Sequence, residues 1–270
     1  MPEFEIMIDL HIHTKFSPDG HTEMEEYVKK AIELKMPAIG FSEHVDYDYL
    51  RSPLEMETTD FDSFFKRFSE LKEKYAGQIK LLLGAETGYS LPAENDIKEF
   101  LERYPFDYDI ISTHIVYDED PWLQPYFIGK TPYEAYTRYL KCVLEAVRSP
   151  INYQTVAHFG YVLRQAPYKE RELDFETYGD YLDEILSTIV KKDKALELNT
   201  KTGGLGVFQP DIKIVKRYIE LGGKNFTFGS DAHELKRLAE NYSVVAETLK
   251  SLGIKYLLHF EGRVPIYDKL

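Results

Sequence analysis

The sequence predicts an α/β protein built as a closed or nearly closed barrel, and three observations support that fold class. Short apolar strands alternate seven times with amphipathic helices along 270 residues, which is typical of a parallel sheet. No linker or low-complexity stretch interrupts the alternation, so we expect one domain over residues 1–270. Seven consecutive units of this length fit a closed barrel better than an open, doubly wound sheet, and no glycine-rich nucleotide-binding loop follows the first expected strand.

The expected elements follow one another in a regular order. The first strand ends in Asp9-Leu-His-Ile-His13, where alternation places both histidines on one side and Ile6, Ile8, Leu10 and Ile12 on the other. The pattern Thr22-x-x-Glu25 resembles a capping box and predicts the start of the first helix. Further strands are expected at 38–42, 79–86, 108–113, 153–157, 195–199, 225–228 and 256–260, and further helices at 61–75, 93–103, 132–147, 175–192, 210–221 and 235–249.

The composition is that of a folded protein with an acidic surface. Lys and Arg number 33 against 46 Asp and Glu, a formal charge of −13, which disfavours binding to nucleic acid and to anionic membranes. We expect no membrane-spanning segment, and Met1–Glu5 lacks the basic and apolar regions of a secretory signal. The one cysteine, Cys142, lies in an expected helix and is expected to be structural. Together these features predict a cytoplasmic protein, and they leave open whether it forms a homo-oligomer.

Potential metal ligands gather where the expected strands end. A lone histidine at a strand end is more often structural than a ligand, but six of the eight histidines of the chain lie at such ends. Parallel barrels place their active sites at this rim. The candidates are His11, His13, His44, Glu86, His114, His158, Asp231 and His233.

Eight ligands exceed the about four that one zinc ion takes. We therefore expect two or three divalent ions with a bridging carboxylate. Zn, Fe and Mn all suit mixed nitrogen and oxygen ligands. Such clusters serve the hydrolysis of phosphate esters, so the expected partner is a small phosphorylated substrate.

At this point the chain resembles the polymerase and histidinol phosphatase (PHP) family. The matching motifs span nearly the whole chain: Asp9-Leu-His-Ile-His-Thr14, Ser42-Glu-His44, Gly84-Ala-Glu86, Ser112-Thr-His114, His158 and Gly229-Ser-Asp-Ala-His233. Within the family it is most similar to the monofunctional histidinol-phosphatases, because of Arg164 after His158, Glu197-Leu-Asn-Thr200 and Phe260-Glu-Gly-Arg-Val-Pro265. The resemblance implies a distorted (β/α)7, TIM-like barrel that hydrolyses L-histidinol phosphate in histidine biosynthesis.

The resemblance also implies a trinuclear metal centre. The three ions would be held, in turn, by His11, His13, Glu86 and Asp231; by Glu86, His114 and His158; and by Asp19, His44 and His233. Asp19 is a candidate only through the resemblance, since Asp in a Pro-Asp-Gly sequence is otherwise an ordinary turn residue. We favour it over His21, and we expect His21 and His259 to be structural or exposed.

Glu86, Asp231 and Arg164 are the expected catalytic residues. The planar fork of Arg164 matches a phosphate group, and Lys15, Lys201 and Arg263 are further candidates for binding it. The chain departs from similar phosphatases at Asn199-Thr-Lys-Thr-Gly-Gly204, where those proteins have Asn-Thr-Ser-Gly-Leu-Arg. The second arginine expected there is missing, and Lys201 is its available replacement.

Other functions remain alternatives at this stage. Another phosphomonoester, such as phosphotyrosine or a nucleotide, would change only the substrate. A non-catalytic metal-binding module is disfavoured by the complete ligand set. A metal-dependent amidohydrolase would place a lysine between the ions, where this chain has Glu86. Trp122, on the longest expected rim loop, lines the substrate pocket or packs in the core, and the proton donor is a water or an acid near Asp118 to Asp120.

Overall fold

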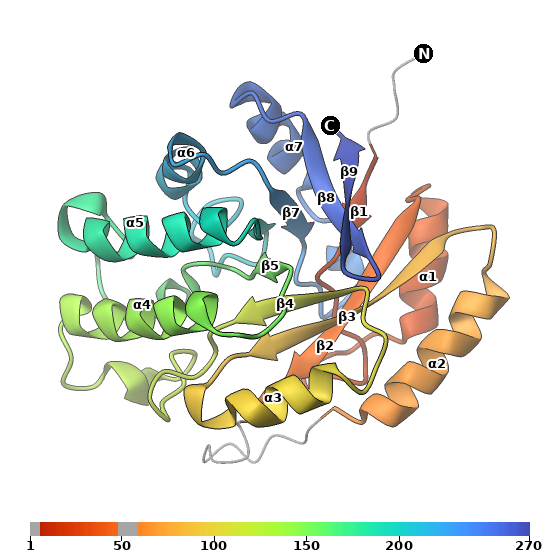
Figure 1. Ribbon diagram of the computed structural model, residues 1–270, viewed down its shortest axis with the longest axis horizontal. Coiled ribbons are helices and arrows are strands. Elements are labelled where there is room, and N and C mark those ends of the chain that lie inside the picture. The colour runs from red at the N-terminus through yellow and green to blue at the C-terminus, as the bar shows by residue number, and fades with distance from the viewer. Residues whose placement is uncertain (1–5, 48–58) are drawn as a thin grey trace.

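Seven parallel strands form a nearly closed barrel in the computed structural model, which describes residues 6–47 and 59–270 (Figure 1). The N-terminal residues 1–5 considered above lie outside that range. Backbone hydrogen bonds from Leu10 to Phe228 and from His13 to Ala232 bring the first and last strands together. The strands are paired in chain order: β1 (Ile8–Asp9), β2 (Ala38–Val45), β3 (Lys80–Gly88), β4 (Tyr108–Ser112), β5 (Thr155–Val156), β6 (Ala195–Asn199) and β7 (Phe226–Gly229). The predicted α/β, TIM-like barrel is confirmed.

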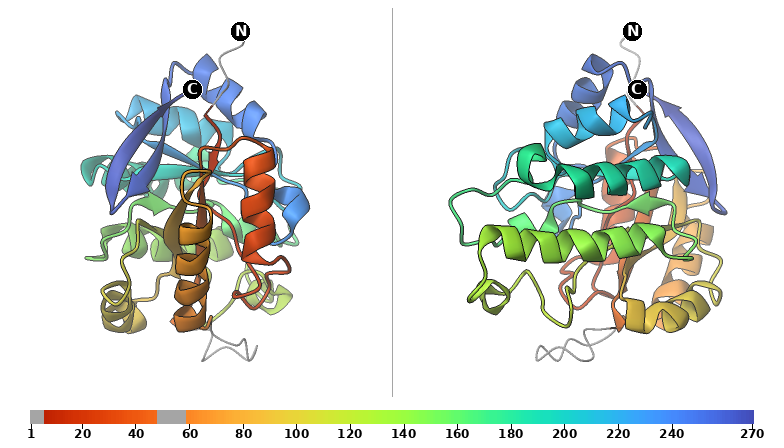
Figure 2. Two further views of the ribbon diagram at one scale, coloured as in Figure 1. Left: turned by 90° about the vertical axis from the view of Figure 1, so that its right-hand side faces the viewer. Right: turned by 60° about the vertical axis from the view of Figure 1, so that its left-hand side comes forward.

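Helices surround the strands, as the views in Figures 1 and 2 show. Their apolar faces pack on the outside of the barrel and form the larger of two buried clusters. They are α1 (Met24–Glu33), α2 (Phe61–Lys74), α3 (Glu94–Leu101), α4 (Pro132–Arg148), α5 (Phe175–Lys191), α6 (Ile212–Glu220) and α7 (Tyr242–Ser251). Cys142 is buried on α4 as a free thiol, in agreement with its expected structural role.

The starts of α1 and α7 differ from the prediction for identifiable reasons. The capping box of α1 is formed by Glu23 and Glu26, one residue later than expected. The Thr22 hydroxyl accepts a bond from the Leu235 backbone N–H at 2.9 Å, so it serves a tertiary contact instead. The last helix begins at Tyr242 rather than near 235, because Ala239 and Asn241 adopt positive φ angles that interrupt a helix.

The amino end of the barrel interior is filled by apolar side chains. Tyr108 lies there, and its hydroxyl donates to the Leu10 carbonyl at 2.6 Å. A Cβ atom at Gly84 would lie 2.2 Å from the Tyr108 ring, so only glycine leaves room for the ring. Because this end is a packed core, polar chemistry is confined to the carboxyl ends of the strands.

A C-terminal hairpin closes the amino end of the barrel. It consists of β8 (Tyr256–Glu261) and β9 (Val264–Lys269), of which the sequence predicted only the first (Figure 1). Leu258 and Phe260 join the interior cluster, and Arg263, at the turn, donates to Gln154 Oε1 at 3.2 Å. Gln154 precedes β5, so Arg263 lies at the end of the barrel opposite the histidines. Its expected role in substrate binding is therefore wrong.

Within the described residues, none of the helices combines the length and apolarity needed to cross a membrane.

Candidate metal centre

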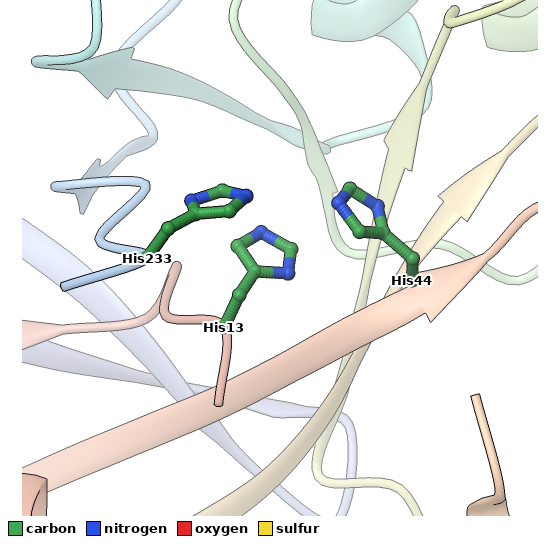
Figure 3. A group of neighbouring side chains, drawn as sticks. All are labelled: His13, His44 and His233. Carbon is green, nitrogen blue, oxygen red and sulfur yellow. The ribbon is translucent and has the colours of Figure 1, made fainter. Parts of the chain in front are cut away.

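The barrel brings all the predicted ligands together at the carboxyl ends of its strands. Each side chain extends from the end of a strand or from the segment just after it, except Asp19, which comes from the loop between β1 and α1. Figure 3 shows three of them, His13, His44 and His233, from segments far apart in the chain. Potential ligand atoms fall into four overlapping groups: His13, His44 and His233; His11, Glu86 and His158; His11, His13 and Asp231; and His44, Asp46 and His114.

His11 and His13 share one side of the chain, as predicted, with ring centroids 5.1 Å apart. The apolar residues before them do not all take the other side. Leu10 belongs to the interior cluster, and a Cβ atom at Gly40 would lie 3.1 Å from it. Leu10 and His11 therefore both face the interior, and the alternation is interrupted between them. The strand itself is short and ends at Asp9.

Glu86, at the centre of the cluster, faces five histidines. Its Oε1 atom lies 2.7 Å from His158 Nε2 and 3.0 Å from His114 Nε2. Its Oε2 atom lies on the other side, at 3.2 Å from His11 Nε2, 3.3 Å from His13 Nε2 and 3.1 Å from His44 Nδ1. One oxygen of this carboxylate thus contacts His158 and His114, and the other contacts His11, His13 and His44. This is the arrangement that a bridging ligand requires.

Two further carboxylates complete the cluster. Asp231 Oδ1 lies 3.7 Å from His13 Nε2, and the residue holds a positive φ of 52°. Asp19 Oδ2 lies 2.9 Å from His233 Nε2, and its Oδ1 lies 3.5 Å from His44 Nε2. These neighbours agree with the ligand sets that the resemblance implied. His21 is exposed, and His259 lies on the hairpin, where it bonds to Asp268.

Several buried polar atoms in the cluster lack a hydrogen-bond partner within residues 6–47 and 59–270. They are His11 Nε2, His13 Nε2, His44 Nδ1, Glu86 Oε2 and Asp19 Oδ1. Buried polar atoms are costly unless something satisfies them, and these converge on the same space. Nitrogen and carboxylate oxygen are ligands for Zn, Fe and Mn, so the residues present fit a cluster of divalent cations.

The charges in the cluster also attract cations. Burial alone would lower the pKa of His11, but the carboxylates of Glu197, Glu86 and Asp231 raise it well above the ordinary value. Burial opposes a similar shift at His114, where Asp46 and Glu86 raise the pKa to about 10. Burial lowers the pKa of His158 to about 4, and Arg164 acts in the same direction. The excess negative charge therefore favours a cation at these nitrogens, and protons compete with metal for them.

Two carboxylates that the sequence analysis did not assign to the site contact ligand histidines at the ring nitrogen that faces away from Glu86. Glu197 Oε1 lies 2.6 Å from His11 Nδ1, and its other oxygen accepts from the His158 backbone N–H at 2.7 Å. Asp46 Oδ1 lies 2.9 Å from His114 Nδ1. Glu197 begins the motif Glu197-Leu-Asn-Thr200 noted above. Asp46 could have been suspected because it follows a strand-end histidine by two residues.

A cavity of about 340 Å³ opens onto the cluster. Among its lining residues are Glu86, Asp231, Asp120, Trp122, Tyr161, Arg164 and Lys201. The rings of Trp122 and Tyr161 stack with centroids 6.0 Å apart and form an aromatic wall. Trp122 thus lines this cavity, which combines cations, acids and flat apolar surface.

The expected phosphate-binding residues differ in where they lie. Arg164 is buried, and its three donor groups reach Gln209 at 3.0 Å, Asp231 at 3.2 Å and Asn199 at 3.1 Å. Lys201 Nζ lies 3.3 Å from Asp231 Oδ1 and lines the same cavity. Lys15 instead pairs with Glu23 at 2.8 Å on the surface, with 54% of its side chain exposed. The structure does not bring Lys15 to the site, so that expectation is wrong.

Known proteins resemble this chain along almost its whole length. It matches the family model for the PHP domain over residues 9–201. It is 30% identical to the "Probable histidinol-phosphatase" of Clostridium acetobutylicum, with 97% of this chain and 100% of that protein covered. It is 29% identical to the histidinol-phosphatase of Lactococcus lactis subsp. lactis, with 94% of each covered.

A solved structure supports the same relationship. The crystal structure of the histidinol phosphate phosphatase from Lactococcus lactis subsp. lactis, complexed with zinc, L-histidinol and phosphate, aligns with a TM-score of 0.87 at 28% identity. The alignment covers 97% of this chain and 99% of that one. With the family model matched across most of the barrel, this chain belongs to the PHP domain family.

Proposed function

We propose that this protein is a metal-dependent phosphomonoesterase, a histidinol-phosphatase that converts L-histidinol phosphate and water to L-histidinol and phosphate in histidine biosynthesis. The observation that supports it best is the one cavity onto which the ligand cluster, Arg164, Lys201 and an aromatic wall all open. The similar phosphatase from Lactococcus lactis contains zinc, L-histidinol and phosphate in its crystal structure.

The proposed metal ligands are those that the barrel gathers around Glu86. Two or three divalent ions, Zn, Fe or Mn, would be held by His11, His13, Glu86 and Asp231, by Glu86, His114 and His158, and by Asp19, His44 and His233. When bound, these ions supply Lewis-acid catalysis, because they ease the ionisation of water and offset charge on the phosphoryl oxygens.

Arg164 is the proposed phosphate clamp. Its guanidinium is held by Gln209 and Asn199, and this support fixes the plane of the fork before a substrate arrives. Its third bond goes to Asp231, which joins the arginine to the ligand cluster. Glu86 and Asp231 are therefore the proposed catalytic carboxylates. Glu86 contacts histidines on both of its oxygens, and Asp231 connects the ligand cluster to Arg164.

Lys201 is the proposed second phosphate-binding cation, and it also supports a second candidate function. A lysine presents a point charge rather than a planar fork, so it selects less sharply for one phosphate geometry. The second candidate is a phosphatase of this family that acts on another phosphomonoester, such as phosphotyrosine or a nucleotide. A non-catalytic metal-binding module is the third and least supported alternative.

Phosphate release from L-histidinol phosphate, p-nitrophenyl phosphate and phosphotyrosine tests these proposals. We expect selective, metal-dependent release from L-histidinol phosphate, lost in His114→Ala. Lys201→Met should raise KM for the phosphate ester, whereas Arg263→Met, a cation removed at the far end of the barrel, should leave KM unchanged. Equal rates on all three esters would favour the second candidate, and no release with any of the three metals would favour the module.

Some expectations stay predictions at this point. These are a single domain over residues 1–270, a cytoplasmic location, no binding to nucleic acid, and a homo-oligomeric state that is open either way.

A further inference from the structure

We propose that Asp46 is a positioning residue that orients His114 and His44 for metal binding, an inference that rests on the proposed metal centre. Asp46 is buried between the two rings, with Oδ1 at 2.9 Å from His114 Nδ1 and Oδ2 at 3.3 Å from His44 Nδ1. The proposed ligand sets give these two histidines to different ions. One carboxylate therefore contacts ligands of two proposed metal positions, through a hydrogen bond at His114 and an ion-pair contact at His44.

The geometry at His114 specifies which ring nitrogen faces the proposed metal position. A neutral imidazole carries one proton, and a carboxylate at Nδ1 holds the proton there. The Nε2 lone pair then faces Glu86 Oε1, 3.0 Å away, on the cavity side. A carboxylate behind a ligating histidine in this way fixes the tautomer and the ring orientation.

His11 shows the same arrangement on the other side of the cluster. Its Nδ1 atom lies 2.6 Å from Glu197, and its Nε2 atom lies 3.2 Å from Glu86 Oε2. Two histidines from different strands are thus each placed between Glu86 and an outer carboxylate. Because the same arrangement occurs twice, it supports a shared function for Asp46 and Glu197. Each would orient the ring of a histidine so that its Nε2 atom faces Glu86.

Gly88 shows that the fold makes room for Asp46. A Cβ atom at Gly88 would lie 1.7 Å from Asp46 Oδ1, far inside contact distance. Gly88 has no positive φ, so its backbone would accept another residue and only space demands glycine there. The side chain of an alanine at this position would displace the Asp46 carboxylate from His114.

Four variants of the protein distinguish a positioning role of Asp46 from direct metal binding and from a nonspecific effect of the substitution. Asp46→Ala removes the carboxylate, Asp46→Asn keeps one acceptor oxygen, and Gly88→Ala displaces the carboxylate without changing it. Gly179→Ala is the matched control, since a Cβ atom there meets no atom within 4 Å. Zinc affinity is measured by chelator competition, and the Nδ1–H signal of His114 is observed by nitrogen-15 NMR of the zinc-loaded protein.

We expect Asp46→Ala and Gly88→Ala to lower zinc affinity about 10- to 100-fold at the positions that use His114 and His44. Zinc held through His11, His13 and Asp231 should keep its affinity, and Asp46→Asn should lose less than Asp46→Ala. The double variant should bind zinc nearly as Asp46→Ala does, because a Cβ atom at Gly88 would overlap the carboxylate at 1.7 Å and meet His114 Nδ1 only at 3.3 Å. The His114 Nδ1–H signal should be present in wild type and lost in Asp46→Ala.

Three results would overturn the inference. They are wild-type zinc affinity in Asp46→Ala and Gly88→Ala, additive losses in the double variant, and a loss in Asp46→Asn as large as in Asp46→Ala, which would make Asp46 a direct ligand. A wild-type protein that binds no zinc would overturn both this inference and the proposed metal centre. Zinc binding without phosphatase activity would contradict the proposed function alone.

Discussion

Asp109, on β4, is a fully buried acid outside the metal cluster, and replacing it with asparagine should make the protein more stable at alkaline pH. Its Oδ1 atom accepts a bond from the Thr87 hydroxyl at 2.6 Å, and Oδ2 has no hydrogen-bond partner among the described residues. Burial raises the pKa of Asp109 from 3.8 to about 7. The folded protein therefore holds a proton there that the unfolded chain releases at a lower pH.

The sign of the effect follows from that difference in proton binding. Between about pH 4 and pH 7 the folded state binds more protons than the unfolded state, so the free energy of unfolding falls as pH rises. The shift of roughly three pKa units corresponds to at most about 4 kcal/mol, and about 3 kcal/mol of it develops between pH 5 and pH 8. Asp109→Asn keeps an acceptor for Thr87 and abolishes this loss.

Urea unfolding of wild type and Asp109→Asn at pH 5 and pH 8 measures the effect. The stability gained by the variant should be larger at pH 8 by about 3 kcal/mol. Both proteins are measured with a chelator present, because Glu86, a proposed metal ligand, also raises the pKa of Asp109 and pH-dependent metal binding would not cancel in the difference. Asp180→Asn, an exposed acid on α5, controls for the loss of one charge. An equal gain at both pH values would refute the reasoning.

Three further predictions concern the core, the clamp and the metal. Gly84→Ala should lower the free energy of unfolding by about 1–3 kcal/mol, measured with urea, because its Cβ would overlap the Tyr108 ring; an unchanged midpoint would contradict the packing described. Arg164→Lys should raise both KM and the inhibition constant of inorganic phosphate about tenfold through loss of the planar fork, whereas an effect on kcat alone would argue against a clamp. A chelator should lower Tm, and added zinc should restore it in proportion to the logarithm of its concentration, since the ions bind only the folded cluster; a Tm that does not respond would count against the centre.

Much of the site could be predicted because one topological rule connects distant residues. Parallel strands in a barrel end at the same rim, so histidines at strand ends converge wherever they lie in the chain. This is why His11, near the start, and His233, near the end, could be assigned to one cluster before any distance was known. Asp19 needed the family resemblance, because a turn aspartate has no local feature that distinguishes it.

The remaining differences arise from contacts that local patterns do not encode. Arg263 and Lys201 are both cations after predicted strands, but the hairpin turns Arg263 to the amino end of the barrel, whereas the loop after β6 points Lys201 into the cavity. Thr22 does not cap the first helix as expected. Its hydroxyl accepts a hydrogen bond from the backbone of Leu235, more than two hundred residues away in the chain.

By itself, then, the sequence determined the order of strands and helices, the barrel class and the rim at which the ligands gather, because these depend on periodicity and chain order. Only the tertiary structure decided which nitrogen of five histidines faces Glu86, that Asp46 and Glu197 contact ligand histidines from outside the cluster, and which cations reach the cavity. Those features depend on how the barrel closes, since closure sets the distances between side chains from different strands.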